Sequence, residues 1–137
     1  MTRYFDASAL VKEFVQEEHT AEVRALLRDG IAATARLSLV EIASALHRRS
    51  REGHLAPDAR DAALARLEAN ADALVLVELG PEVERLARDL LGTHPLRAAD
   101  AIQLASAVHL AAELGTGVPF VAYDRRLIGA ARAEGME

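Results

Sequence analysis

Four carboxylate side chains stand far apart in the sequence, and each lies where an apolar segment begins or ends: Asp6, Glu41, Asp100 and Asp124. This spacing is typical of acidic groups that several strands and helices bring to one shared point. Carboxylate oxygens bind hard divalent cations such as Mg2+, which in turn bind phosphate oxygens. The four residues therefore predict a shared acidic site that holds a divalent cation against a phosphate group.

The segments around these acids alternate between short apolar runs and longer helical patterns, which favours an α/β fold. The strand candidates are residues 4–5, 31–34, 74–79 and 118–123, of which 74–79 most resembles a buried strand. Helical patterns cover residues 8–14, 20–28, 38–52, 57–70, 81–91, 96–114 and 124–134. No internal repeat, linker or low-complexity segment interrupts them, so we expect one domain over residues 1–137.

Composition narrows the functional classes. The chain has 137 residues, 51% of them hydrophobic and 27% charged, which is typical of a globular domain. It contains no cysteine, so disulfides, thiolate zinc sites and cysteine nucleophiles are excluded. No apolar run approaches the roughly 18 residues of a membrane span, and the N-terminus lacks the pattern of a signal peptide. We therefore expect a cytoplasmic protein that does not enter a membrane.

The charge balance limits how nucleic acid could be bound. The net charge is −5 and aromatic residues make up 4% of the chain, with no Trp. A broad electrostatic surface for nucleic acid and serial base stacking are both disfavoured by these values. Any nucleic acid would have to be held by local groups of Arg and by metal ions.

Each acid also has a purely structural explanation. Asp6 and Asp124 directly precede helical segments and could serve as N-caps. Glu41 follows Ser38 by three residues, which matches a capping box. Asp100 falls in the first turn of its helix, where the helix dipole favours a negative charge.

Taken together, the four acids point beyond helix capping. Asp6 and Asp124 follow predicted strands, and open α/β sheets place their ligand crevice at the carboxyl ends of the strands. Glu41 and Asp100 each share an otherwise apolar helical stripe, which turns them inward. Burying and crowding unpaired carboxylates is costly. A bound cation would remove that cost, and without one we expect at least one acid to bind a proton more readily.

Four segments resemble the acidic blocks of the PIN domain, especially those of VapC-type toxin ribonucleases of type II toxin–antitoxin systems: YFDASALVK (4–12), SLVEIASAL (38–46), LRAADAIQLASA (96–107) and VAYDRRLIGAA (121–131). The likeness spans nearly the whole chain, and the third block is the most specific. It implies a three-layer α/β/α fold with a central parallel sheet of four or five short strands.

The same resemblance implies Mg2+- or Mn2+-dependent endonucleolytic cleavage of RNA. The metal site would then consist of Asp6 and Asp100 as main ligands with Glu41 and Asp124 beside them, all four being catalytic, and Ser8 as a supporting hydroxyl. The chain departs from the family pattern two residues before its last Asp, where Ala122 replaces a Ser or Thr that often lies there.

Partners follow from the resemblance as well. It implies an RNA substrate, a small VapB-like antitoxin whose tail blocks the acidic crevice, and a homodimer, with the apolar faces of 37–46 and 57–70 as candidate contacts. Arg125 and Arg126 lie beside Asp124 and are candidates for RNA contact, as are Arg48 and Arg49. The last two could equally form a solvated helix end.

Three other interpretations remain open from the sequence. The first is a PIN-domain RNA-processing nuclease that is not a toxin. The second is a phosphatase of the HAD type or a receiver domain with Asp6 as phosphoryl acceptor, although the phosphatase usually has a second Asp at the position of Ser8 and both classes need a later Lys. The third is a non-catalytic protein-binding module in which all four acids are helix caps.

Overall fold

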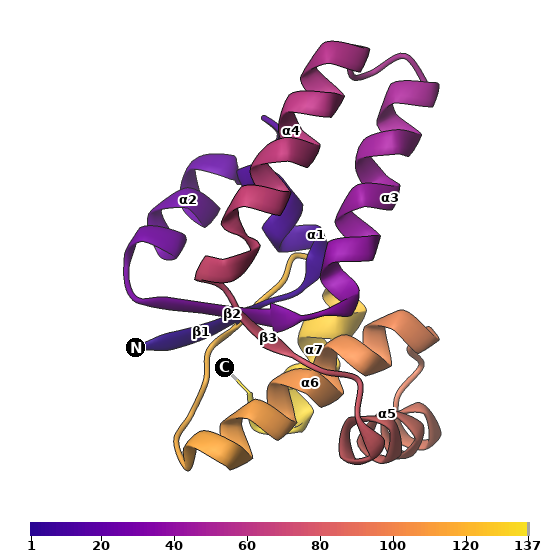
Figure 1. The fold of residues 1–137 in the computed structure, drawn as a ribbon. Helices are drawn as coiled ribbons and strands as arrows, with labels where there is room; N and C mark the ends of the chain where they lie inside the picture. Colours follow the sequence, from indigo (N-terminus) through magenta and orange to yellow (C-terminus); the bar gives the residue numbers. More distant parts are fainter. Residues whose placement is uncertain (137) are drawn as a thin grey trace.

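A parallel sheet of short strands forms the centre of the protein (Figure 1). The structure is a computed structural model and describes residues 1–136. Within them the strands are β1 (Thr2–Phe5), β2 (Ile31–Ala35), β3 (Val75–Val77) and β4 (Phe120–Val121), in the spatial order β3-β2-β1-β4. All three pairings are parallel, so the carboxyl ends of the strands share one edge of the sheet.

Helices cover both faces of this sheet, as expected for a parallel sheet (Figure 1). One face carries α1 (Ala7–Leu10), α2 (Thr20–Arg28), α3 (Leu37–Arg51) and α4 (Pro57–Asn70). The other carries α5 (Pro81–Thr93), α6 (Ala98–Leu114) and α7 (Arg125–Ala133). Short 3-10 turns follow α1 at Val11–Glu13 and α4 at Ala71–Ala73. The predicted three-layer α/β/α fold is confirmed.

Side chains of the central strands point alternately into two hydrophobic cores, one on each face of the sheet. Tyr4 and Ala33 belong to the core beneath α5, α6 and α7, whereas Phe5 and Ala32 belong to the core beneath α1–α4. This is the two-residue period of a strand with both faces covered. The small side chains of β2 let α3 and α6 approach the sheet closely, and those two helices carry Glu41 and Asp100.

The structure corrects the interpretation of residues 74–79. The sequence makes them the clearest candidate for a buried strand, but only Val75–Val77 pair, and β3 lies at the edge of the sheet. Val75 is 40% exposed and Leu79 is 55% exposed. An unbroken apolar run fits an edge strand as well as a central one, because periodicity alone does not report the strand's neighbours.

The helices α3 and α4 run side by side away from the sheet and are joined at their far ends (Figure 1). Their large apolar side chains are mostly core rather than free surface: Ile42 and Leu46 of α3 and Leu67 of α4 are buried, as is Ala63 of α4. Val40, on the first turns of α3, is 67% exposed and is the exception on that helix.

Candidate active site

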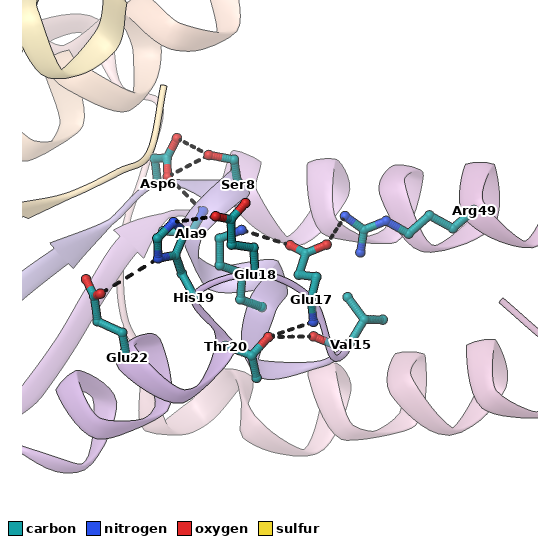
Figure 2. A network of polar contacts seen from close by, with 11 residues as sticks. Asp6, Ser8, Ala9, Val15, Glu17, Glu18, His19, Thr20, Glu22 and Arg49 are labelled. Atoms are coloured by element: carbon teal, nitrogen blue, oxygen red, sulfur yellow. Dashed lines mark hydrogen bonds and ion pairs between the residues drawn. The ribbon is translucent and has the colours of Figure 1, made fainter. Parts of the chain in front are cut away.

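Asp6 lies directly after β1 and caps α1. Its carboxylate accepts a hydrogen bond from the backbone N–H of Ala9 at 2.9 Å. The Ser8 hydroxyl contacts both carboxylate oxygens, at 3.0 and 2.8 Å, and these contacts are drawn in Figure 2. Ser8, predicted as a supporting hydroxyl, therefore fixes the orientation of a carboxylate whose residue is only 4% exposed.

Burial raises the pKa of Asp6 from 3.8 to about 6. The hydrogen bonds from Ala9 and Ser8 lower this pKa, and the negative charges of Asp100 and Glu41 raise it further. Asp6 follows β1, Glu41 lies on α3 and Asp100 lies on α6, and the charges of the last two act on the Asp6 carboxylate. The buried carboxylate binds a proton more readily than a free Asp does.

Glu41, Asp100 and Asp124 line one pocket at the carboxyl edge of the sheet, together with Arg97, Arg125, Arg126 and two small residues. Burial raises the pKa of Asp100, the charge of Asp124 raises it further, and the charge of Arg97 lowers it. The structure thus brings all four predicted acids to the same edge, with Asp6 as the most buried member.

The structure supports the helix-cap explanation for Asp124 and the helix-dipole explanation for Asp100, but not the capping box proposed for Glu41. Asp124 is an N-cap, accepting hydrogen bonds from the backbone N–H groups of Arg126 and Leu127 at 2.9 and 3.1 Å. Asp100 does lie in the first turn of α6. The capping box of Ser38 and Glu41 is wrong, because α3 begins at Leu37 and its N-cap position, Arg36, makes no side-chain cap bond. Three acids therefore have a capping or dipole role and also face the shared edge.

Ser38 belongs instead to a buried polar group beneath the acids. It is fully buried, and its Oγ contacts the Oγ1 of Thr34 at 2.6 Å. The amide of Gln103, on α6, donates to Ser38 Oγ at 2.9 Å and to the Glu41 carboxylate at 2.7 Å. Sequence reasoning missed Gln103. Its signal was a single Gln on the apolar side of an Ala-rich helix, three residues after Asp100.

The predicted basic residues occupy two places. Arg125 and Arg126 line the acidic pocket, and neither forms an ion pair with another residue of the described range 1–136. Arg48 and Arg49 line a neighbouring pocket that also includes Glu41 and Ser8.

Arg49 is not a free cation. Its guanidinium lies 2.6 Å from the Glu17 carboxylate, a contact drawn in Figure 2, and the other oxygen of Glu17 lies 3.1 Å from Lys12 Nζ. Lys12 also lies over the ring of Tyr123, 5.1 Å from its centroid. One carboxylate therefore pairs with two of the cations beside Ser8.

The tightest group of metal-ligating side chains lies elsewhere. Within residues 1–136, Glu82, His109 and Glu113 are the trio whose ligand atoms all come within 4.8 Å of one another. They join α5 to α6, with the His109 ring 3.5 and 3.8 Å from the two carboxylates. No three of the four predicted acids approach one another this closely in the described chain, as expected for like charges that repel each other.

Comparison with known proteins places the chain in a family. The PIN domain matches residues 3–133. Ribonuclease VapC45 of Mycobacterium tuberculosis strain CDC 1551 and ribonuclease VapC49 of strain H37Rv are each 37% identical over 138 residues, covering 96% of this chain and 90% of the relative. Ribonuclease VapC47 of strain CDC 1551 is 33% identical over 137 residues, covering 96% of this chain and 91% of the relative.

Solved structures share the fold at lower identity. The crystal structure of Mycobacterium tuberculosis VapC20, a Sarcin-Ricin loop cleaving toxin, is 18% identical, superimposes with a TM-score of 0.68 and covers 95% of both chains. A toxin–antitoxin complex from Klebsiella pneumoniae is 13% identical, with a TM-score of 0.61 and coverage of 93% of this chain and 91% of that chain. No helix among the described residues is both long and apolar enough to cross a membrane. The chain belongs to the PIN domain family.

Proposed function

We propose that this protein is a Mg2+- or Mn2+-dependent endoribonuclease of the VapC type, formed as a single domain over residues 1–137, and the toxin of a toxin–antitoxin pair. The observation that carries the proposal is the meeting of Asp6, Glu41, Asp100 and Asp124 at the carboxyl edge of the sheet. Membership of the PIN family and relatives that are VapC ribonucleases support it.

The residues at this edge fit a hard divalent cation. The charged side-chain atoms at this edge that could bind a metal ion are carboxylate oxygens, the ligand type that Mg2+ and Mn2+ prefer. Asp6 is buried, and its pKa is raised by burial and by two neighbouring acids, so a cation bound there would offset the cost of its negative charge. Asp6 and Asp100 would hold the ion, with Glu41 and Asp124 beside it. When bound, the ion activates water and stabilises the negative charge that develops on phosphate.

The protein's own side chains prepare this chemistry. Ser8 and the backbone N–H of Ala9 hold Asp6 in one orientation before substrate arrives. Arg125 and Arg126 line the acidic pocket, where guanidinium groups can bind the phosphates of RNA. Arg48 lines a second pocket that shares Glu41 with the acidic one, so an RNA strand that passes over Glu41 could contact both basic groups.

Asp6 is poorly suited to the role of phosphoryl acceptor. Both of its oxygens already contact the Ser8 hydroxyl, and the only lysine, Lys12, pairs with Glu17. The PIN family match replaces the interpretation as a HAD-like phosphatase or receiver domain.

The partner is proposed on the same basis. A VapB-like antitoxin would cover the acidic pocket, and the likeness to a toxin–antitoxin complex supports an antitoxin as partner. A homodimer is also proposed, with exposed Val40 on α3 as one candidate contact, because the other large apolar side chains of α3 and α4 are buried or partly buried.

Cleavage of RNA by the purified protein tests the nuclease proposal. The protein is incubated with RNA with and without MnCl2 or MgCl2, alongside Asp6→Asn, Asp100→Asn and the exposed control Asp72→Asn. We expect metal-dependent cleavage that only the first two variants lose. Equal cleavage by a folded Asp6→Asn variant would contradict the assignment, and hydrolysis of a phosphomonoester without RNA cleavage would favour a phosphatase.

Induction in a bacterial host tests the toxin. We expect growth arrest on induction that Asp6→Asn relieves and that co-expression of a small upstream gene relieves. Undiminished growth with confirmed RNA cleavage would instead favour the RNA-processing nuclease.

A further inference from the structure

Gln103 is a buried amide whose hydrogen-bonding groups are fully used. It is 2% exposed and lies on α6 among Ala and Leu side chains. Its Oε1 accepts from the Tyr4 hydroxyl at 2.6 Å, and its Nε2 donates to Ser38 Oγ at 2.9 Å and to Glu41 Oε1 at 2.7 Å. A buried amide without partners would be costly. The two N–H donors of this one therefore reach α3, while its oxygen reaches β1.

The orientation of this amide is set by its neighbours. If the amide were turned over, its oxygen would face the carboxylate of Glu41 at about the present 2.7 Å separation, and two acceptors would repel each other. The Tyr4 hydroxyl, by contrast, has a proton to give to Oε1. The amide nitrogen must therefore face Glu41.

The proton positions of the whole group can be assigned in the same way. The Thr34 hydroxyl contacts the carbonyl oxygen of Phe5 at 2.6 Å, and a carbonyl only accepts, so the Thr34 proton points there. Ser38 must then donate to Thr34 across their 2.6 Å contact, and its oxygen accepts from Gln103. Every donor in this series of hydrogen bonds has an acceptor. The series begins at the carbonyl of Phe5, just before Asp6, and passes through Thr34 and Ser38 to Gln103, which also donates to Glu41.

We propose that Gln103 is a positioning residue that holds the Glu41 carboxylate at the acidic edge without cancelling its charge. This rests on the proposed function, because it presumes that the acids bind a metal ion. An Arg or Lys at this place would neutralise Glu41 and weaken cation binding, whereas a neutral amide orients the carboxylate and leaves its full charge for the ion. Gln103 also lies one helical turn after Asp100, so α6 fixes one acid directly and a second through its amide.

The test replaces the amide with side chains that cannot reach or donate to Glu41. Gln103→Met keeps much of the volume but has no N–H, and Gln103→Asn keeps an amide that is one methylene too short. The second variant serves if the first does not fold. Ser106→Ala is the matched control on the same helix, because Ser106 is equally buried, its hydroxyl donates to the Ile102 carbonyl and lies beside the Tyr4 hydroxyl, and it makes no hydrogen bond to Gln103 or Glu41 among the described residues. Tyr4→Phe removes the donor to Oε1 and leaves in place the two donors of Gln103 to Ser38 and Glu41.

The measurements are Mn2+ binding by isothermal titration with MnCl2, and kcat and KM for RNA cleavage. Only the binding that Asp6→Asn abolishes is counted, since Glu82, His109 and Glu113 offer Mn2+ a second place to bind. We expect Gln103→Met and Gln103→Asn to lose about 10- to 100-fold in Mn2+ affinity and kcat, as is common for groups that orient metal ligands. The KM for RNA stays within about twofold, and both control variants keep Mn2+ affinity within about threefold.

Two results would overturn the proposal. One is a folded Gln103 variant with unchanged Mn2+ affinity and kcat. The other is an equal loss of Mn2+ affinity in Tyr4→Phe and Ser106→Ala, which would make the role of Gln103 merely structural. Failure of the proposed function is recognised separately, because the wild-type protein would then show no Mn2+ binding that depends on Asp6, and there would be no site for Gln103 to serve.

Discussion

Asp6→Asn should stabilise the protein at neutral pH when no metal is present, although it should abolish cleavage. The pKa of Asp6 is raised from 3.8 to about 6, and each pH unit of difference corresponds to 1.36 kcal/mol. Ionised Asp6 therefore costs the folded protein about 3 kcal/mol at pH 7.5 relative to an unperturbed Asp. Asn removes the charge and retains an oxygen for the Ala9 N–H, and its amide can donate to Ser8.

The sign and the pH window follow from linkage. A folded-state pKa above the unfolded value means that the folded protein binds the proton more tightly. The stability of the wild type therefore falls as the pH rises through the interval from 3.8 to about 6. Below that interval Asp6→Asn should gain little free energy of unfolding over the wild type. The gain should be about 1.5 kcal/mol at pH 5, inside the interval, and about 3 kcal/mol at pH 7.5, which is an upper value.

Urea unfolding in the presence of a chelator, at pH 5 and pH 7.5, measures this advantage, with Asp72→Asn as an exposed control expected to change stability by less than about 0.5 kcal/mol. Saturating MnCl2 should reverse the order, because an ion bound only to the folded wild type stabilises it. A destabilising Asp6→Asn at pH 7.5 without metal, or an effect independent of pH, would refute the reasoning.

Three further predictions concern the surroundings of the site. Ser8→Ala removes a hydrogen bond that lowers the pKa of Asp6, so the acid limb of the pH–rate profile should move to higher pH; an unmoved limb would argue against the contact. Arg126→Ala should raise the KM for RNA several-fold with kcat nearly unchanged, and should flatten the salt dependence of binding. Glu17→Gln should release Arg49, tightening RNA binding at low salt, at a cost in chemical unfolding of about 1 to 3 kcal/mol because Glu17 is partly buried and pairs with both Arg49 and Lys12.

Much of the fold was predictable because periodicity and helix boundaries are local signals. The helix predicted at residues 20–28 is α2 (Thr20–Arg28), and Pro57 and Pro81 begin α4 and α5 as a proline at the first helical position should. The position of a strand within the sheet is not local. Residues 74–79 form an edge strand of three residues because order in a sheet is set by the partners of each strand.

The acids and Ser8 were recognisable in sequence, but the buried groups around Glu41 were not. Asp6 and Asp124 end apolar segments, a signal visible in the chain itself. The role of Ser38 depends on Thr34 and Gln103, and Gln103 is 65 residues away in sequence, so local motif rules gave a capping box in its place. A buried hydrogen-bond chain requires knowledge of which helices cover the sheet.

Asp6 and Asp124 are helix caps as well as members of the acidic site. This affects which substitution gives an inactive variant that still folds. Compared with Asn, alanine at either position discards hydrogen bonds to backbone N–H groups and costs about 1 kcal/mol, so the Ala version is the less stable of the two inactive proteins. Asparagine preserves the helix starts and removes only the charge. Co-purification of a binding partner with a harmless protein should therefore use Asn, since a partner lost with Ala could simply have lost a folded surface.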